Sequence, residues 1–368
     1  MNLVETLADG IGVRTAGSDE AGQAAEAVAG ALREGGLEPR FQEFWLLGYD
    51  ADEPVVEVDG ERIDAGPCMY AHPTDGTAAG TLRHIGVFKL GFFPEADIFA
   101  IEDADGRELA RLQTSPFGGA AIPFLAGPRQ IVVGPTAFIS GADARLLRER
   151  DGVPARARIG GRFVPGRRDR NVVAEPRGES EEAIVVSSHY DSVWRGPGGI
   201  DNATGVEGMR RVAERLAGRT LPRTVIFCSF AAEEIGLIGS WHFVYEAKLR
   251  GEFERIKGVV NPDCIAHGEL LQLHASPGEL RGRLQARAEA LGLTERCEVR
   301  VGPTAPGVDA FPFSVEGVPA LTILNFPYPE YHLPTDVSGL VDEQRLEDAV
   351  ELAVALVESQ LERPIENS

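Results

Sequence analysis

From residue 168 onward, short apolar runs alternate with helical segments, and this alternation restricts the fold more than any other feature of the sequence. The apolar runs include AIVVSS at 183–188, TVIFCSF at 224–230, GVVNP at 258–262 and ALTILNF at 320–326. Helical periodicity marks TGVEGMRRVAERLAG at 204–218 and the segment 342–363. Because apolar strands that alternate with helices form mostly parallel sheets covered on both faces, we predict an α/β fold here.

The region before residue 168 has a different texture. Residues 48–165 contain short β-like runs separated by Gly and Pro, with one helical segment at 141–152. The first residues add a helical stretch at 20–36 and a strand-like run at 41–47. We therefore predict a small β-rich domain at 48–165, inserted into an α/β domain formed by 1–47 and 166–368.

The composition excludes several classes of function. A formal net charge of −21, from 57 acidic and 36 basic residues, repels nucleic acid and anionic membranes, so we expect neither as a partner. The acidity is explained by a solvated surface or by salt adaptation, and part of it could hold cations. No apolar run approaches the ~18 residues that span a bilayer, and no signal peptide is visible. Four cysteines without a CxxC pair fit a reducing compartment, so we expect a cytoplasmic protein, or a secreted one if the chain is a processed form.

Polar side chains follow each of the main apolar runs. They are His189 and Asp191, then Asp201 in the next loop, Glu233 and Glu234 where the strand is expected to run into a helix, Asp263, and His332. In open α/β sheets, functional residues lie beyond the carboxyl ends of the strands. We therefore expect these side chains to meet at one edge of the sheet.

Five of these residues form a complete ligand set for two divalent metal ions: His189, Asp201, Glu234, Asp263 and His332. Zinc binds histidine nitrogen and carboxylate oxygen, and two zinc ions ~3.5–4 Å apart can share one carboxylate and one water. We expect two Zn²⁺ per chain, with Co²⁺ and Mn²⁺ as alternatives. In the predicted division, Asp201 bridges, His189 and Asp263 bind one ion, and Glu234 and His332 bind the other.

Two further carboxylates are assigned to the chemistry around the metals. Glu233 is predicted to face the water as general base, because neighbouring carboxylates can point in different directions. Asp191 is predicted to accept the second ring N–H of His189. Each motif alone also fits a capped turn or an acidic surface, and only the ordered set of strand-end ligands favours a metal site.

The segments HYDS, GGIDNATG, AAEEIGLIGS, NPDC and YHLPTD, in this order, resemble the zinc aminopeptidases of metallopeptidase family twenty-eight, of the bacterial leucyl aminopeptidase and aminopeptidase S type. The resemblance implies a three-layer α/β/α zinc-exopeptidase fold with a mostly parallel mixed sheet, two co-catalytic zinc ions and peptide substrates. It also implies that Tyr331 stabilises the oxyanion. The insert resembles a protease-associated domain, most clearly at 138–161.

Different functions on the same fold remain open. Deacylases of metallopeptidase family twenty use a similar ligand order but insert a dimerisation domain between the fourth and fifth ligands, and the 69 positions from Asp263 to His332 leave no room for it. A single-zinc glutaminyl-cyclase-like enzyme, a carboxypeptidase and a catalytically silent receptor-like module all stay compatible with the fold. In GVDAFPF at 307–313, Asp309 is followed by Ala310 where many relatives have histidine, which leaves the side-chain preference open.

Overall fold

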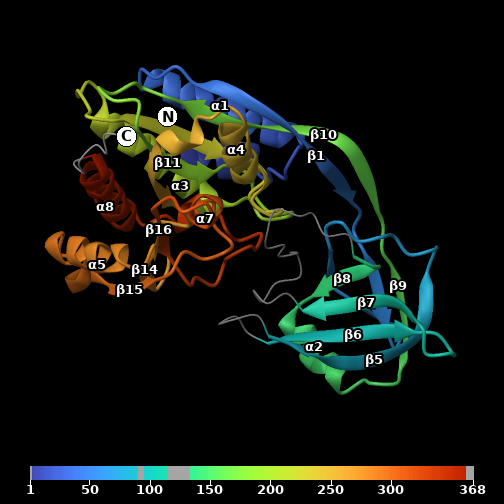
Figure 1. The fold of residues 1–368 in the computed structure, drawn as a ribbon. Helices are drawn as coiled ribbons and strands as arrows, with labels where there is room; N and C mark the ends of the chain where they lie inside the picture. Colours follow the sequence, from blue (N-terminus) through green and yellow to red (C-terminus); the bar gives the residue numbers. More distant parts are fainter. Residues whose placement is uncertain (1, 90–94, 115–132, 362–368) are drawn as a thin grey trace. The chain divides into compact units, whose positions relative to one another are not determined.

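A computed structural model describes residues 2–89, 95–114 and 133–361, which form two compact units. Within the described residues, the first unit comprises 2–46 and 168–361, and the second comprises 47–89, 95–114 and 133–167. Two long strands, β1 (Arg40–Ala51) and β10 (Gly161–Ala174), connect them (Figure 1). The chain thus leaves the first unit within β1, after residue 46, and re-enters it within β10, at residue 168.

The first unit is built on an eight-stranded mixed sheet with the order β1-β10-β12-β11-β13-β16-β14-β15 (Figure 1). Its remaining strands are β11 (Ala183–His189), β12 (Thr224–Phe230), β13 (Ile256–Pro262), β14 (Leu270–Ser276), β15 (Glu298–Gly302) and β16 (Ala320–Asn325). The four central strands β12, β11, β13 and β16 are parallel, whereas β10 and β14 pair antiparallel with β12 and β16. The carboxyl ends of the four central strands therefore lie at one edge.

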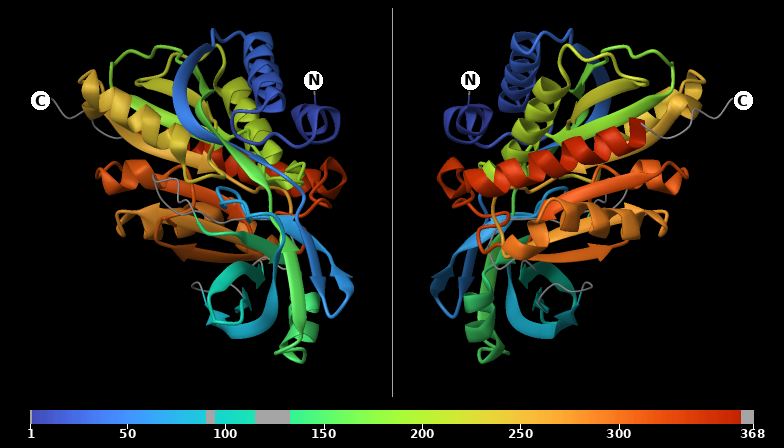
Figure 2. Two further views of the ribbon diagram at one scale, coloured as in Figure 1. Left: turned by 90° about the vertical axis from the view of Figure 1, so that its right-hand side faces the viewer. Right: turned by 90° about the vertical axis from the view of Figure 1, so that its left-hand side faces the viewer.

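Helices cover both faces of this sheet (Figures 1 and 2). On one face, α3 (Gly205–Leu216) and α8 (Glu343–Leu361) contact each other and β11. On the other, Val185 of β11 shares a core with Phe243 of α4 (Ile238–Leu249) and Phe313 of α7 (Phe311–Val315). This arrangement confirms the predicted three-layer α/β/α fold. The other helices of the unit are α1 (Asp19–Glu34), α5 (Leu280–Ala290), α6 (Leu293–Arg296), η1 (Glu5–Ile11), η2 (Gly199–Thr204), η3 (Phe253–Arg255) and η4 (Ser338–Leu340).

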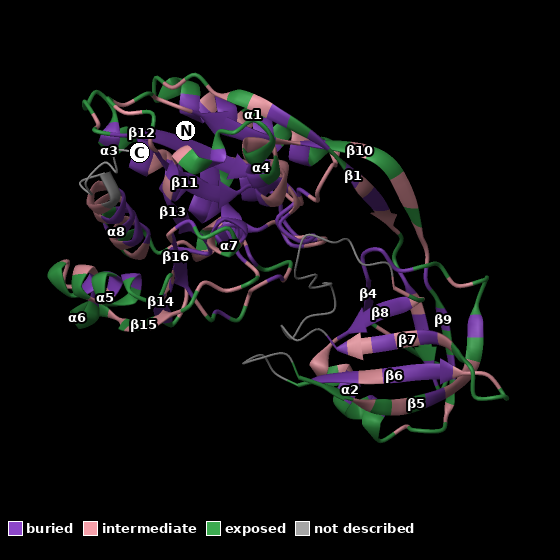
Figure 3. Cartoon of the chain, viewed as in Figure 1, coloured by how far each residue is buried: buried purple, intermediate pink, exposed green. Residues whose placement is uncertain are grey.

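Burial explains why the central strands are almost continuously apolar. All seven residues of β11 and all seven of β12 are buried (Figure 3). A strand with helices on both faces has no solvent-facing side, so alternation of polar and apolar residues is lost. Among the described residues, no helix is both long enough and apolar enough to cross a membrane.

The second unit is β-rich and contains one helix, α2 (Gly141–Arg148), among its described residues. Its sheet has the order β3-β2-β9-β5-β6-β7-β8-β4, and its neighbouring strands pair antiparallel except β7 with β8. Its core includes Val56, Leu82, Phe99, Leu112 and Leu147. The strands are β2 (Val55–Val58), β3 (Glu61–Ile63), β4 (Ala65–Pro67), β5 (Ala78–Phe88), β6 (Ala96–Glu102), β7 (Glu108–Thr114), β8 (Thr136–Ile139) and β9 (Pro154–Arg158).

The predicted insert at 48–165 includes 90–94 and 115–132, which lie outside the described residues. Its identification as a protease-associated domain stays a prediction, because it depends on the resemblance at 138–161.

Candidate metal centre

The predicted ligands come from loops at the carboxyl ends of the four parallel strands. His189 is the last residue of β11, Asp263 directly follows β13, and His332 lies in the loop after β16. Asp201 lies in η2, after β11, and Glu234 lies in the loop after β12. Parallel pairing brings these ends together: in the register, His189 lies opposite Phe230, the last residue of β12.

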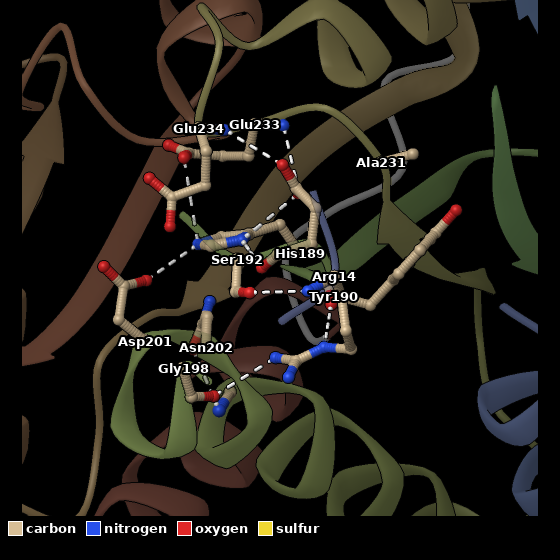
Figure 4. Close-up of polar contacts among 12 residues, drawn as sticks. Arg14, His189, Tyr190, Ser192, Gly198, Asp201, Asn202, Ala231, Glu233 and Glu234 are labelled. Carbon is tan, nitrogen blue, oxygen red and sulfur yellow. Dashed lines mark hydrogen bonds and ion pairs between the residues drawn. The ribbon is translucent and has the colours of Figure 1, made fainter. Parts of the chain in front are cut away.

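Asp201 lies at the centre of the cluster. Its Oδ1 is 3.1 Å from the Nε2 of His189, and its Oδ2 is 3.0 Å from the Nε2 of His332. The contact between His189 and Asp201 is visible in Figure 4. All three side chains are buried. One carboxylate therefore presents a different oxygen to each of two histidines.

Each histidine is accompanied by one further carboxylate. The Oδ1 of Asp263 is 3.7 Å from the Nε2 of His189, and the Oε2 of Glu234 is 3.3 Å from the Nε2 of His332. The donor atoms of His189, Asp201 and Glu234 all lie within 4.8 Å of one another. The same limit holds for His189, Glu233 and Asp263. By the pair distances, Asp263 accompanies His189 and Glu234 accompanies His332, which gives two groups with Asp201 between them.

The donor set fits zinc. Histidine nitrogen and carboxylate oxygen are preferred zinc ligands, and the donors already converge in the protein. Moreover, the Oε1 of Glu234 is buried and has no hydrogen-bond partner among the described residues. An unsatisfied buried carboxylate oxygen is costly, and a bound cation would satisfy it.

Glu233 and Glu234 lie in a loop and not in the helix expected to follow β12. The helix α4 begins only at Ile238, because Ala232 and Leu237 have positive φ values of 56° and 60° and interrupt helical geometry. In this loop the two neighbouring carboxylates point to different partners. The Oε2 of Glu233 is 3.9 Å from the Nε2 of His189, whereas Glu234 approaches His332.

Asp191 connects the first ligand loop to this Glu-Glu loop. Its Oδ1 and Oδ2 accept hydrogen bonds from the backbone N–H groups of Glu233 (3.1 Å) and Glu234 (3.2 Å). The Nδ1 of His189 lies 3.2 Å from the carbonyl oxygen of Asp191 and 3.5 Å from its Oδ1. Asp191 therefore contacts the Nδ1 of His189, as predicted. It also holds the backbone N–H groups of Glu233 and Glu234.

Two buried side chains connect the other ligand loops. The Oδ1 of Asn202 accepts hydrogen bonds from the backbone N–H groups of Gly205 (3.0 Å) and Cys264 (3.1 Å), next to Asp263. A Cβ atom at Gly205 would lie 2.2 Å from this oxygen, so only glycine fits there. The carboxylate of Asp336 accepts hydrogen bonds from the backbone N–H groups of Ile200 (2.7 Å) and Asp201 (3.1 Å).

Tyr331 lies beside the centre. Its ring stacks on the imidazole of His332, with centroids 3.8 Å apart, and it packs edge-on against Tyr328 and Phe326. Burial and the carboxylates of the cluster raise its pKa well above the ordinary value. The phenol is therefore protonated at neutral pH and can donate a hydrogen bond.

The ionisation of the cluster without metal reflects burial and mutual charge. Burial raises the pKa of Glu233 well above its ordinary value, and the charge of Glu234 adds to this shift. Burial also raises the pKa of Glu234 to about 7. Burial would raise the pKa of Asp201, but hydrogen bonds to His189 and His332 lower it. Burial would lower the pKa of His332, but the carboxylates of Glu234 and Asp201 raise it to about 10.

Other residues singled out in the sequence lie outside the ligand cluster. Asp309 is fully buried, and burial raises its pKa to about 7. Ala310, which follows it, is also buried. Cys264 lies at the margin of the cluster, where its Sγ is within 4.8 Å of carboxylate oxygens of Asp201 and Asp263.

The structure adds two residues that sequence reasoning missed. Arg14 and Asp336 are both buried and hydrogen-bond to the loop between His189 and Asp201. Asp336 is part of the YHLPTD segment, four positions after a predicted ligand, and this proximity is a usable signal. Arg14 has none, because it stands in a short stretch of small and apolar residues far from every motif.

A buried cluster of histidines and carboxylates at the carboxyl edge of a three-layer α/β/α sheet is typical of metal-dependent hydrolases. The model of peptidase family M28 matches residues 171–357, slightly more than half of the chain. The chain therefore belongs to peptidase family M28, and it is a hydrolase that acts on peptide bonds.

Individual relatives agree with this family. Aminopeptidase YwaD of Bacillus subtilis is 23% identical over an alignment that covers 97% of this chain and 83% of that protein. An aminopeptidase of Pseudomonas aeruginosa is 40% identical, but the alignment covers 26% of this chain and only 18% of that protein. Because the aligned segment is short, this relative gives no information about the activity of the whole chain.

Solved structures show the same fold. BSAP, a zinc aminopeptidase from Bacillus subtilis, superposes with a TM-score of 0.74 at 20% identity, covering 99% of this chain and 95% of that one. An aminopeptidase from Aneurinibacillus sp. strain AM-1 gives a TM-score of 0.69 at 20% identity, with 100% and 95% coverage. At these identities the likeness establishes the fold.

Proposed function

We propose that this peptidase is a zinc-dependent aminopeptidase with two metal ions per chain. The observation that carries this proposal is the position of Asp201, whose two carboxylate oxygens lie 3.1 Å and 3.0 Å from the Nε2 atoms of His189 and His332. A carboxylate used in this way is suited to bridge two cations. The names of YwaD and BSAP, an aminopeptidase and a zinc aminopeptidase, support the same activity.

The proposed division of ligands follows the two groups around Asp201. His189 and Asp263 would hold one ion, Glu234 and His332 the other, and Asp201 both. When bound, the zinc ions would supply Lewis acidity to the scissile carbonyl and lower the pKa of a water molecule. The remaining steps are assigned to side chains of the protein.

Glu233 is proposed as the general base. Its carboxylate lies 3.9 Å from the Nε2 of His189, beside the ligands, while its backbone N–H is held by Asp191. It would take a proton from the attacking water and return it to the leaving amine. The Tyr331 hydroxyl would donate a hydrogen bond to the developing oxyanion.

The test is hydrolysis of matched peptides in zinc-supplemented buffer, one set with free amino termini and one acetylated, at two salt concentrations. An aminopeptidase cleaves only the free-amine set. Cleavage of acetylated peptides from the carboxyl end would establish a carboxypeptidase instead. If neither set is cleaved although two zinc ions are bound, the aminopeptidase proposal is wrong and the cyclase and deacylase reactions should be assayed.

The salt comparison addresses the charge of −21. A rate that is unchanged between the two salt concentrations supports a merely solvated acidic surface. A rate that rises with salt supports salt adaptation, because screening relieves repulsion among the surface carboxylates.

A further inference from the structure

Arg14 is a fully buried arginine whose guanidinium, among the described residues, donates hydrogen bonds to backbone oxygen atoms. Its Nε donates to the carbonyl of Tyr190 (2.8 Å) and its Nη2 to that of Gly198 (3.2 Å). Its Nη1 donates to the carbonyl oxygens of Leu7, Gly12 and Pro197. Figure 4 shows this side chain with its contacts to Tyr190 and Gly198. Burial lowers its pKa to about 10, so it remains charged at neutral pH.

The backbone of Arg14 is tied to the same loop. Its N–H donates to the Oγ of Ser192 (2.9 Å), and its carbonyl accepts from the N–H of Ser192 (3.1 Å). The segment that contains Arg14 is therefore joined to residues 190–198 along its side chain and its main chain. The partners in residues 190–198 are more than 170 positions away in the sequence.

The two ends of this loop adjoin two of the predicted ligands, His189 and Asp201. Tyr190 directly follows His189, and Gly198 lies three positions before Asp201. One guanidinium holds the carbonyls at both ends, while the Nε2 of His189 and the Oδ1 of Asp201 lie 3.1 Å apart. The planar, multi-donor guanidinium group can make these contacts at once, whereas a lysine ammonium offers three donors at a single point.

The positive charge of Arg14 also favours the close approach of the ligands. The cluster gathers several buried carboxylates, and Arg14 interacts electrostatically with Asp191, Asp336, Asp201 and Glu234. Buried carboxylates repel one another unless a cation lies nearby. The positive charge of the guanidinium therefore reduces the repulsion among the ligand carboxylates. Arg14 itself offers no ligand atom.

We infer that Arg14 is a positioning residue of the metal centre, which fixes the separation of His189 and Asp201 by holding both ends of the loop between them. This inference rests on the proposed metal-dependent function. It assigns to the amino-terminal segment, outside the residues matched by the family model, a direct influence on metal affinity.

The experiment measures zinc content and zinc affinity, the latter by competition with a chromophoric chelator, for the unmodified protein and for R14K and R14M. The matched controls are R223K and R223M. Arg223 is also buried, but it pairs with Glu182 (2.7 Å) just before β12, at the opposite end of the strands from the ligands. Thermal unfolding of each variant is recorded with and without zinc.

We expect R14K and R14M to bind zinc about 10–100-fold more weakly, the range typical of outer contacts to a metal site. The rise in melting temperature on zinc addition should shrink accordingly. The Arg223 variants should unfold at lower temperature while their zinc affinity is unchanged. The absorption spectrum of the cobalt-loaded protein, which reports ligand geometry, should change in R14K and not in R223K.

Zinc affinity and a cobalt spectrum in R14K that equal those of the unmodified protein would overturn the inference. If the Arg14 variants do not fold, Ser192→Ala removes only the acceptor for the Arg14 N–H, and an unchanged zinc affinity in that variant would equally count against it. If the unmodified protein itself binds no zinc, the proposed function fails instead, so the two failures are distinguishable.

Discussion

The carboxylate of Asp191 accepts a 3.1 Å hydrogen bond from the backbone N–H of Glu233, and thereby joins the loop after β11 to the loop after β12. Its second oxygen holds the N–H of Glu234. Asp191→Asn preserves the shape but leaves one acceptor oxygen for two N–H donors. We expect zinc affinity to fall about 10–100-fold, measured by chelator competition. Unchanged affinity would show that the loop after β12 holds its position without this contact.

Glu233→Gln should retain two zinc ions and lose turnover. Glutamine is nearly isosteric but cannot accept a proton, so kcat should fall about 10²–10⁴-fold. Metal analysis and steady-state kinetics on the same preparation measure both quantities. Glu234→Gln is the neighbouring control, because it removes a ligand charge and should lower the zinc content. Near-normal turnover in metal-loaded Glu233→Gln would refute the base assignment.

Asp201→Ala should lose both metals, because its two oxygens face both groups of ligands. Asp263→Ala should lose zinc from one group only. Zinc content after dialysis against metal-free buffer distinguishes these results: none per chain for the first variant and about one for the second. Retention of two zinc ions by Asp201→Ala would show that this carboxylate is not shared.

Tyr331→Phe should lower kcat with little change in KM. The hydroxyl group is assigned to an oxyanion that exists only in the transition state, and loss of one such donor costs about 10²–10³-fold in kcat. The ring stack on His332 is preserved in phenylalanine, so the zinc content should not change. A rise in KM at constant kcat would place the hydroxyl group in substrate binding instead.

Zinc binding should release protons and strengthen with increasing pH. The carboxylates of Glu234 and Asp201 outweigh the burial of His332 and hold its pKa at about 10 without metal, so this imidazole carries a proton at pH 7. A zinc ligand must be neutral imidazole, so the proton leaves on binding. Apparent affinity therefore rises with pH up to about 10. Calorimetry in buffers of different ionisation enthalpy measures the release, and no release at pH 7 would contradict this ionisation.

The convergence of the ligands could be predicted because it depends on local pattern. Buried parallel strands read as continuous apolar runs, as in β11 and β12, and parallel pairing brings their carboxyl ends together. The start of α4 could not be predicted, since positive φ values at Ala232 and Leu237 leave no clear mark in AAEEIGLIG. Strands β14 and β15 lie nearer the edge of the sheet, and their residues are only partly buried. They therefore lack the continuous apolar run by which the central strands could be predicted.

Contacts between segments that are distant in the sequence could not be predicted. Asp336 reaches back 136 positions to the N–H of Ile200, and Arg14 reaches forward 176 positions to the carbonyl of Tyr190. Neither residue type nor spacing reveals such a pair, because the partner is a backbone group that every residue possesses. Sequence reasoning therefore identified the candidate ligands and missed the side chains that hold their loops.

The discontinuity of the first unit has a consequence for biosynthesis. Residues 47–167 emerge from the ribosome before residues 190–198, so the β-rich unit can fold while Arg14 still lacks its carbonyl partners. The amino-terminal segment must then remain available until the loop after β11 has been translated. We therefore expect the proposed metal centre to be completed late in synthesis, and we expect fragments that begin near residue 168 to bind zinc poorly although they contain every predicted ligand.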